Sequence, residues 1–210
     1  MDYEKQVNKE HYSFSRYFHK QRWMSYWYQS KEIISRPEIK SVLDIGPGTD
    51  FLKNLLAIHR PDIVYHSLDV AADIEPDVLG SVTKIPLENN SYNVVCAFQI
   101  LEHIEFKDFD VAVSEICRVS SKYAFISLPH FGPSLELQVK VPLIPRIQWA
   151  TKIPFSKKHF FNGEHYWEIG KAGYPVKRIK NVLESKMRLI EDYVPFENQY
   201  HHFFIGEVTK

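Results

Sequence analysis

Cysteine is nearly absent from the chain, which has only Cys96 and Cys117 among its 210 residues. The two do not form a C-x-x-C pair, and this argues against a disulfide framework or a cysteine zinc site. A chain with so few thiols suits a reducing compartment.

An excess of charge of one sign is also missing, since Lys plus Arg and Asp plus Glu each number 26. No overall field therefore draws the protein to nucleic acid or to an anionic membrane. No apolar run approaches the ~18 residues of a spanning helix, and the first ten residues are polar and acidic, unlike a signal peptide. We expect a cytoplasmic location, no nucleic-acid partner and no stable membrane insertion; the sequence does not indicate the oligomeric state.

Apolar residues make up 44% of the sequence, enough for the core of a soluble globular domain. Short apolar runs alternate with segments of helical periodicity, which favours right-handed crossovers and a parallel sheet. We predict an α/β, doubly wound, Rossmann-like fold with a seven-stranded, mostly parallel sheet and an antiparallel last strand. The expected strands are 41–46, 63–70, 77–82, 93–98, 123–128, 187–194 and 201–208, and the expected helices after the first strand begin near 51, 106 and 176.

Two segments depart from this alternation. Residues 1–36 place apolar and aromatic side chains at helical spacing up to Pro37, which predicts an N-terminal helical cap. Residues 129–170 are rich in proline and aromatics without a clear period, and we interpret them as a lid-like insertion with short elements of its own. The main domain would then span 37–210.

The first predicted strand runs into the glycine turn VLDIGPGTD, residues 42–50. A nicotinamide or flavin fingerprint needs a third glycine where Phe51 stands, and no Gly-Lys-Ser/Thr follows as in a P-loop. The turn resembles motif I of the class I S-adenosylmethionine-dependent methyltransferases, in the small-molecule branch called type 11. Ser67-Leu68-Asp69 and IPLENNSYNVVCAFQILEHI (85–104) resemble later elements of that family in the same order.

The resemblance implies that S-adenosyl-L-methionine is the cofactor. Backbone without a side chain can approach its amino-acid end, and Asp69 would chelate the ribose hydroxyls, unless this carboxylate only caps a turn. Two positions depart from the family: Asp50 replaces the third glycine, and Ser81 stands where relatives often carry an acidic residue. The implied cofactor-binding residues are Asp44, Gly46, Pro47, Gly48, Asp69, Val70, Ser81, Val82 and Gln99.

Methyl transfer is a displacement at carbon that needs a well-held nucleophile, and a histidine base would help a hydroxyl acceptor. His103, His130 and His165 follow predicted strands or lie in the insertion, and we take them as candidate catalytic residues. The segment ending in Glu102-His103 resembles the E-x-x-E-H metal motif of some RNA and ubiquinone-pathway O-methyltransferases. Because Gln99 replaces its first glutamate, we expect no metal.

The sequence therefore predicts a methyltransferase that methylates an oxygen of a small molecule or glycan by direct in-line displacement. The preference for a glycan follows from aromatic richness and from a loose resemblance of residues 165–170 to surface-polysaccharide methyltransferases. One alternative is a methyltransferase-fold protein that binds or activates a partner without turnover, with Asp50 and Ser81 as signs of a decayed site. Another is an RNA methyltransferase, which the balanced charge disfavours.

Overall fold

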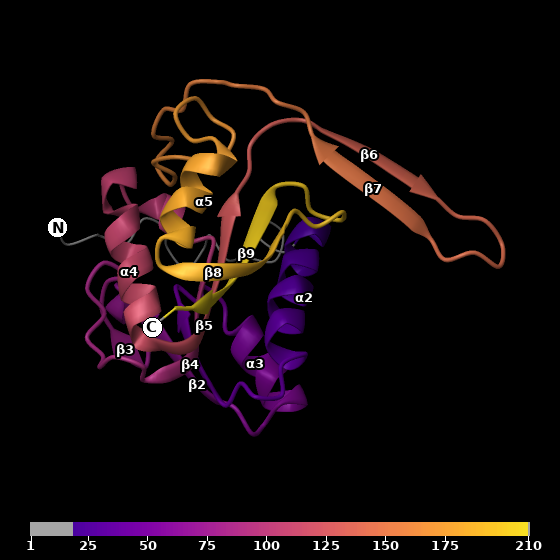
Figure 1. The fold of residues 1–210 in the computed structure, drawn as a ribbon. Coiled ribbons are helices and arrows are strands. Elements are labelled where there is room, and N and C mark those ends of the chain that lie inside the picture. The colour runs from indigo at the N-terminus through magenta and orange to yellow at the C-terminus, as the bar shows by residue number, and fades with distance from the viewer. Residues whose placement is uncertain (1–18, 210) are drawn as a thin grey trace.

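A computed structural model describes residues 19–209 and shows one central sheet flanked by helices (Figure 1). The strand order is β3-β2-β1-β4-β5-β9-β8. The first five strands pair in parallel, whereas β9 runs antiparallel to both β5 and β8, which confirms the predicted fold class. The strands are β1 (Ser41–Ile45), β2 (Val64–Asp69), β3 (Val78–Leu79), β4 (Tyr92–Phe98), β5 (Ser120–Pro129), β8 (Met187–Tyr193) and β9 (His201–Val208).

The central strands are buried on both faces because their sequences are continuous apolar runs. Leu43 and Val95 face one apolar cluster, which α4 (Phe109–Val119) and α5 (Val176–Glu184) cover. Val42 and Val94 face a second cluster on the opposite side of the sheet. Helices α2 (Lys20–Ile34) and α3 (Phe51–His59) cover that face, so the sheet is doubly wound.

Two local details differ from the expectation, and the start of α3 adds a third observation. The third strand has only two residues, because the Asp77 carboxylate accepts hydrogen bonds from the backbone N–H and hydroxyl of Ser67 where a longer ladder would begin. A 3-10 turn at Phe106–Asp108 precedes α4. Asp50 occupies the N-cap position of α3 without a side-chain cap hydrogen bond, and the Thr49 hydroxyl instead lies 3.2 Å from Tyr26 Oη.

Helix α2 accounts for the described half of the predicted N-terminal cap; the expected helical segment before residue 19 lies outside the described residues. The Tyr26 ring stacks on Phe51 at a centroid distance of 4.5 Å, so α2 packs directly behind the glycine turn. On its other side, Ser25 Oγ lies 2.5 Å from His201 Nδ1 and accepts a hydrogen bond from Asn198. These contacts fix α2 to both the turn and β9.

The insertion does contain elements of its own. β6 (Ser134–Val139) and β7 (Ile147–Lys152) form a separate antiparallel hairpin that extends away from the body (Figure 1). The chain then returns and buries Trp167 completely. At its base the insertion is closed by backbone hydrogen bonds from Phe131 N to Ile169 O and from Ile169 N to Pro129 O, at 2.8 and 3.0 Å.

No helix within residues 19–209 is long and apolar enough to cross a membrane. Cys96 and Cys117 are both buried free thiols, as their separation in sequence suggested.

Candidate functional site

The segments that follow β1, β2 and β4 meet at one edge of the sheet, because β1 pairs with both other strands in parallel. The glycine turn, Asp69 and Gln99 are therefore neighbours at the carboxyl edge. In doubly wound sheets this edge is where ligands bind.

The glycine turn needs glycine for two reasons. Gly46 and Gly48 have φ angles of +64° and +61°, in the left-handed region that other residues rarely adopt. A Cβ on Gly46 would also lie 2.0 Å from Ile100 Cδ1. The turn is thus pressed against the segment after β4, and Gly46, Pro47 and Gly48 remain partly exposed.

Asp44 lies at the end of β1, directly before this turn, and is almost fully buried. Burial raises the pKa of its carboxyl to about 7, the hydroxyl of Tyr65 acts in the opposite direction by donating a 2.8 Å hydrogen bond, and the charge of Asp50 raises the pKa further. Two carboxyl groups therefore interact beside the turn. A ligand ammonium at this place would favour the charged form of Asp44.

Asp69 is half-buried at the end of β2, and its Oδ1 accepts a 2.8 Å hydrogen bond from the backbone N–H of Ala71. It does cap a turn, as the alternative reading expected, and this bond fixes the orientation of the carboxylate. The neighbouring Val70 side chain is exposed. Beyond the next strand, β3, Ser81 Oγ lies 2.9 Å from Thr83 Oγ1, and Val82 is buried.

Gln99 directly follows β4 and has a left-handed φ of +59°, an uncommon conformation for a residue other than glycine. Its side-chain amide donates a 3.1 Å hydrogen bond to Ser127 Oγ, and its backbone N–H donates to Ser127 O. Both bonds hold Gln99 against β5. Strained backbone of this kind is concentrated at functional sites, and the role of Gln99 in the cofactor site stays a prediction.

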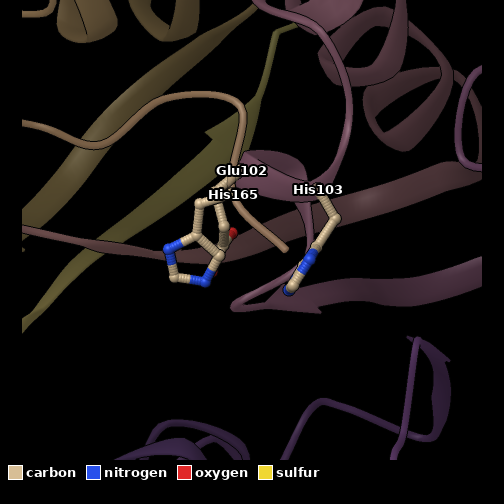
Figure 2. Close-up of side chains that lie close together, drawn as sticks. All are labelled: Glu102, His103 and His165. Atoms are coloured by element: carbon tan, nitrogen blue, oxygen red, sulfur yellow. The ribbon is translucent and has the colours of Figure 1, made fainter. Parts of the chain in front are cut away.

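Just beyond Gln99 the structure brings Glu102, His103 and His165 together (Figure 2), with one potential ligand atom of each within 4.8 Å of the others. His103 Nδ1 donates to Glu164 O at 2.9 Å, and His165 Nδ1 donates to Glu168 Oε1 at 3.0 Å. These bonds set the tautomer and ring orientation of each histidine, as outer partners do for catalytic and metal-binding histidines.

The electrostatics of this cluster are unusual. Glu102 is fully buried, and neither of its carboxylate oxygens has a hydrogen-bond partner among residues 19–209. Burial raises its pKa to about 7, although the charge of His165 acts in the opposite direction. Burial lowers the pKa of His165, but the Glu168 hydrogen bond and the nearby carboxylates raise it more, so the net shift is upward. The cluster can accept a proton, and two imidazoles with one carboxylate can also hold a divalent ion.

His130 belongs to a different group. Its Nδ1 lies 3.1 Å from His202 Nδ1, and His202 Nε2 lies 2.5 Å from Asp192 Oδ1. Burial, followed by the charges of His202 and Lys152, lowers the pKa of His130 to about 3. The structure therefore brings two of the three predicted histidines together and places the third directly after β5, in a chain of contacts with His202 of β9 and Asp192 of β8.

Two acidic residues of this site were not among the predicted site residues. Glu102 lay in the recognised motif, and its burial was not visible in the sequence. Glu168 follows His165 by three residues, and this H-x-x-E spacing was the available signal for an oriented base. The expectation that the site uses no metal stays a prediction.

This architecture, with a glycine turn after β1, an acidic residue after β2 and a reversed strand next to β5, is the class I S-adenosylmethionine-dependent methyltransferase fold. Residues 43–126 match the family model described as a methyltransferase domain. These residues form a methyltransferase domain of the type 11 branch, and the enzyme is S-adenosyl-L-methionine-dependent.

Solved structures show the same fold at low sequence identity. The PH0226 protein from Pyrococcus horikoshii OT3 is 12% identical, with a TM-score of 0.61 over 97% of this chain and 100% of that one. The N-methyltransferase NodS from Bradyrhizobium japonicum WM9, in complex with S-adenosyl-L-homocysteine, is 6% identical, with a TM-score of 0.60 over 98% and 95% of the two chains. The 1,6-didemethyltoxoflavin-N1-methyltransferase of Burkholderia thailandensis is 10% identical, with a TM-score of 0.60 over 93% and 85%. A search of the curated proteins found no match.

Proposed function

We propose that the protein transfers the methyl group of S-adenosyl-L-methionine to an oxygen of a small molecule or glycan. The observation that carries the proposal is the Glu168–His165 pair beside Glu102 and His103, at the sheet edge that also holds the glycine turn. A carboxylate-oriented imidazole is suited to take a hydroxyl proton, and oxygen acceptors require that step more than amines do.

When bound, the cofactor supplies an electrophilic methyl group on a sulfonium, and the residues present fit such a molecule. The open backbone of Gly46, Pro47 and Gly48 would meet its amino-acid end, with the Asp44 carboxylate available to an ammonium. Asp69 would accept hydrogen bonds from the ribose hydroxyls. The remaining predicted contacts, on the adenine side and toward the acceptor, are Val70, Ser81, Val82 and Gln99.

In this proposal His165 removes the acceptor proton at Nε2, while Glu168 holds the Nδ1 proton and stabilises the imidazolium that forms. His103 is the second candidate base, since its Nδ1 is similarly engaged by Glu164 O. His130 is the least suited, because its environment favours a neutral ring in contact with His202. In-line positioning of the acceptor supplies the rest of the rate enhancement.

One observation favours a variant of this mechanism. The buried carboxylate of Glu102 has no hydrogen-bond partner among residues 19–209, and a divalent ion held together with His103 and His165 would compensate its charge. Such an ion would lower the pKa of an acceptor hydroxyl directly. EDTA distinguishes the metal-free mechanism from this variant, because the chelator abolishes turnover only if an ion is required.

The first experiment is calorimetric titration of S-adenosyl-L-homocysteine into the wild-type protein and into Asp69→Ala, with EDTA and then with Mg²⁺. We expect micromolar binding that the substitution abolishes. Asp62→Ala is the matched control, because Asp62 lies just before the opposite end of β2 and its carboxylate binds Lys40 and Arg60 on the surface. Equal binding by Asp69→Ala and Asp62→Ala would remove Asp69 from the cofactor site.

An acceptor screen with methyl-labelled cofactor then tests the substrate class. Labelled methyl ethers on hydroxyl or sugar acceptors support the proposal. Labelled amines would instead indicate that nitrogen is the methylated atom, as the names of two of the structural neighbours state for those proteins. Cofactor binding without labelled product across the panel would favour a binding or partner-activating role. RNA labelling with steep salt dependence would favour an RNA substrate. A cytoplasmic location, suggested by the two free thiols, is part of the same proposal.

A further inference from the structure

The β6–β7 hairpin is amphipathic, although it stands apart from the core. Side chains alternate between the two faces of a ribbon, and directly opposed residues share a face. Leu137 is opposite Trp149 and Val139 is opposite Ile147, whereas Gln138 is opposite Gln148 between them. One face of the ribbon is therefore apolar and the other is polar.

Nothing in the described part of the chain covers the apolar face. Its large side chains are 41% to 59% exposed, and the hairpin extends beyond the body of the domain (Figure 1). These side chains are Leu135, Leu137, Val139, Ile147 and Trp149. An uncovered apolar patch of this kind marks an interaction surface, and an isolated two-stranded ribbon gains stability when its face is buried.

The tip of the hairpin, residues 141–145, is apolar as well. Leu143 is fully exposed, and its φ of +66° lies in the left-handed region, where a glycine or asparagine would be unstrained. Pro142 and Pro145 have no backbone N–H, and the N–H of Ile144 already donates to Val141 O at 3.2 Å. The tip therefore presents an aliphatic side chain with few unpaired donors, which suits an apolar phase.

Cations surround the apolar tip. Lys140 and Arg146 flank it directly, and Lys157 and Lys158 follow the hairpin. The only acidic residue between positions 134 and 158 is Glu136, on the polar face, where it accepts a hydrogen bond from Ser134. A protein with no net charge thus concentrates positive charge around its most exposed apolar residues. A complementary partner would have an apolar interior that receives the tip and an anionic outer layer that contacts the cations.

We propose that the β6–β7 hairpin docks the protein on an anionic lipid bilayer. Leu143 and Ile144 enter the boundary between headgroups and acyl chains, and Lys140 and Arg146 contact the lipid phosphates. Trp149, an amphipathic ring, lies at the headgroup level. Contact stays shallow, because the outer edges of the two strands carry backbone groups that hydrocarbon cannot satisfy. This proposal does not depend on the acceptor or on the reaction.

Co-flotation of the full chain with vesicles tests the proposal. Vesicles of phosphatidylcholine with an equal share of phosphatidylglycerol should carry the protein upward, whereas vesicles of phosphatidylcholine alone should carry little. Binding should weaken at high salt, because the charges involved lie at the surface. Absence of binding to the anionic vesicles at low salt would overturn the proposal.

Substitutions then separate the apolar and the charged contributions. Leu143→Asp should lower the partition coefficient by roughly 10-fold or more, because it removes one buried aliphatic side chain. The Lys140→Gln, Arg146→Gln double variant should lower it by about 25-fold on anionic vesicles, at ~5-fold per cation. Ile58→Asp is the matched control: it places the same charge at an exposed isoleucine on α3 and should bind as the wild type does. Unaltered melting temperature confirms that each variant is folded.

The competing occupant of the apolar face is a second copy of the chain. Light scattering of the lipid-free protein distinguishes the two occupants. If the wild type is a dimer and Trp149→Asp is a monomer, the apolar face serves self-association and the proposal is overturned. A monomer whose flotation depends on Leu143 supports it. Wild-type flotation that Leu143→Asp leaves unchanged would also overturn it.

Discussion

The buried carboxyl of Asp44 leads to a quantitative prediction about stability. Its pKa is about 7 in the folded protein, chiefly through burial, against an ordinary value of about 4 in the unfolded chain. The folded state therefore binds the proton more tightly, and this group's contribution to the free energy of unfolding falls as pH rises from about 4 to about 7. Relative to low pH, where both states bind the proton, the stability lost through this group is about 2 kcal/mol near pH 5.5 and about 4 kcal/mol near pH 8.5.

Asp44→Asn removes the titration and retains an oxygen that can accept the Tyr65 hydrogen bond. We expect the variant to be more stable than the wild type by amounts that approach those two figures, so its advantage grows with pH. The assay is urea unfolding of both proteins at the two pH values, in the absence of cofactor.

Tyr65→Phe provides the opposite test. Its hydroxyl donates to the Asp44 carboxylate and lowers the pKa, so its loss should destabilise the protein by ~1–3 kcal/mol at the higher pH and by less at the lower one. If Asp44→Asn is equally stable relative to the wild type at both pH values, the carboxyl does not titrate near neutrality and the reasoning fails. Asp44→Asn should also bind S-adenosyl-L-homocysteine more weakly than the wild type does, because the Asp44 carboxylate is the proposed partner of the ligand ammonium.

Three further outcomes are expected. Glu168→Gln should lower kcat by roughly 10²- to 10⁴-fold and move the acidic limb of the pH–rate profile to lower pH, because His165 loses the carboxylate that raises its pKa; an unshifted limb would exclude His165 as the base. Gly46→Ala should destabilise the fold by ~1–3 kcal/mol, because of the left-handed φ at this position and the close contact of a Cβ with Ile100. When thermal unfolding is measured, the Gly46→Ala, Ile100→Ala double variant should recover only part of that loss. Glu102→Gln should abolish any stabilisation of the protein by added divalent ions, and identical ion-dependent melting shifts in wild type and variant would exclude an ion at this carboxylate.

The central sheet could be predicted because its strands are short apolar runs separated by glycine, proline or asparagine turns. The order of the motifs then located the carboxyl edge, where the structure places the glycine turn, Asp69 and Gln99. The third strand was predicted too long, since the hydrogen bonds that replace its ladder join the Asp77 carboxylate to the backbone N–H and hydroxyl of Ser67, ten residues away. Such contacts leave no periodic pattern in the sequence.

The cluster around His165 could not be predicted from the sequence. It depends on the return of the insertion to the sheet, where the backbone of Tyr166 donates to Glu102 O. That contact is long-range, and no local propensity specifies it. The hairpin, by contrast, had a visible signal: LELQV at 135–139 alternates apolar and polar residues, although the prolines and aromatics around it hid the period.

The closed base of the insertion has a consequence for how this enzyme can diversify. Because the chain leaves the sheet at Pro129 and rejoins it at Ile169 through adjacent backbone bonds, the intervening segment can be exchanged or lengthened without altering the register of β5 with β9. His165 and the hairpin are carried on this same segment. A graft taken from a relative would therefore transfer the candidate base and the docking element as a single cassette, and leave the glycine turn of the recipient intact.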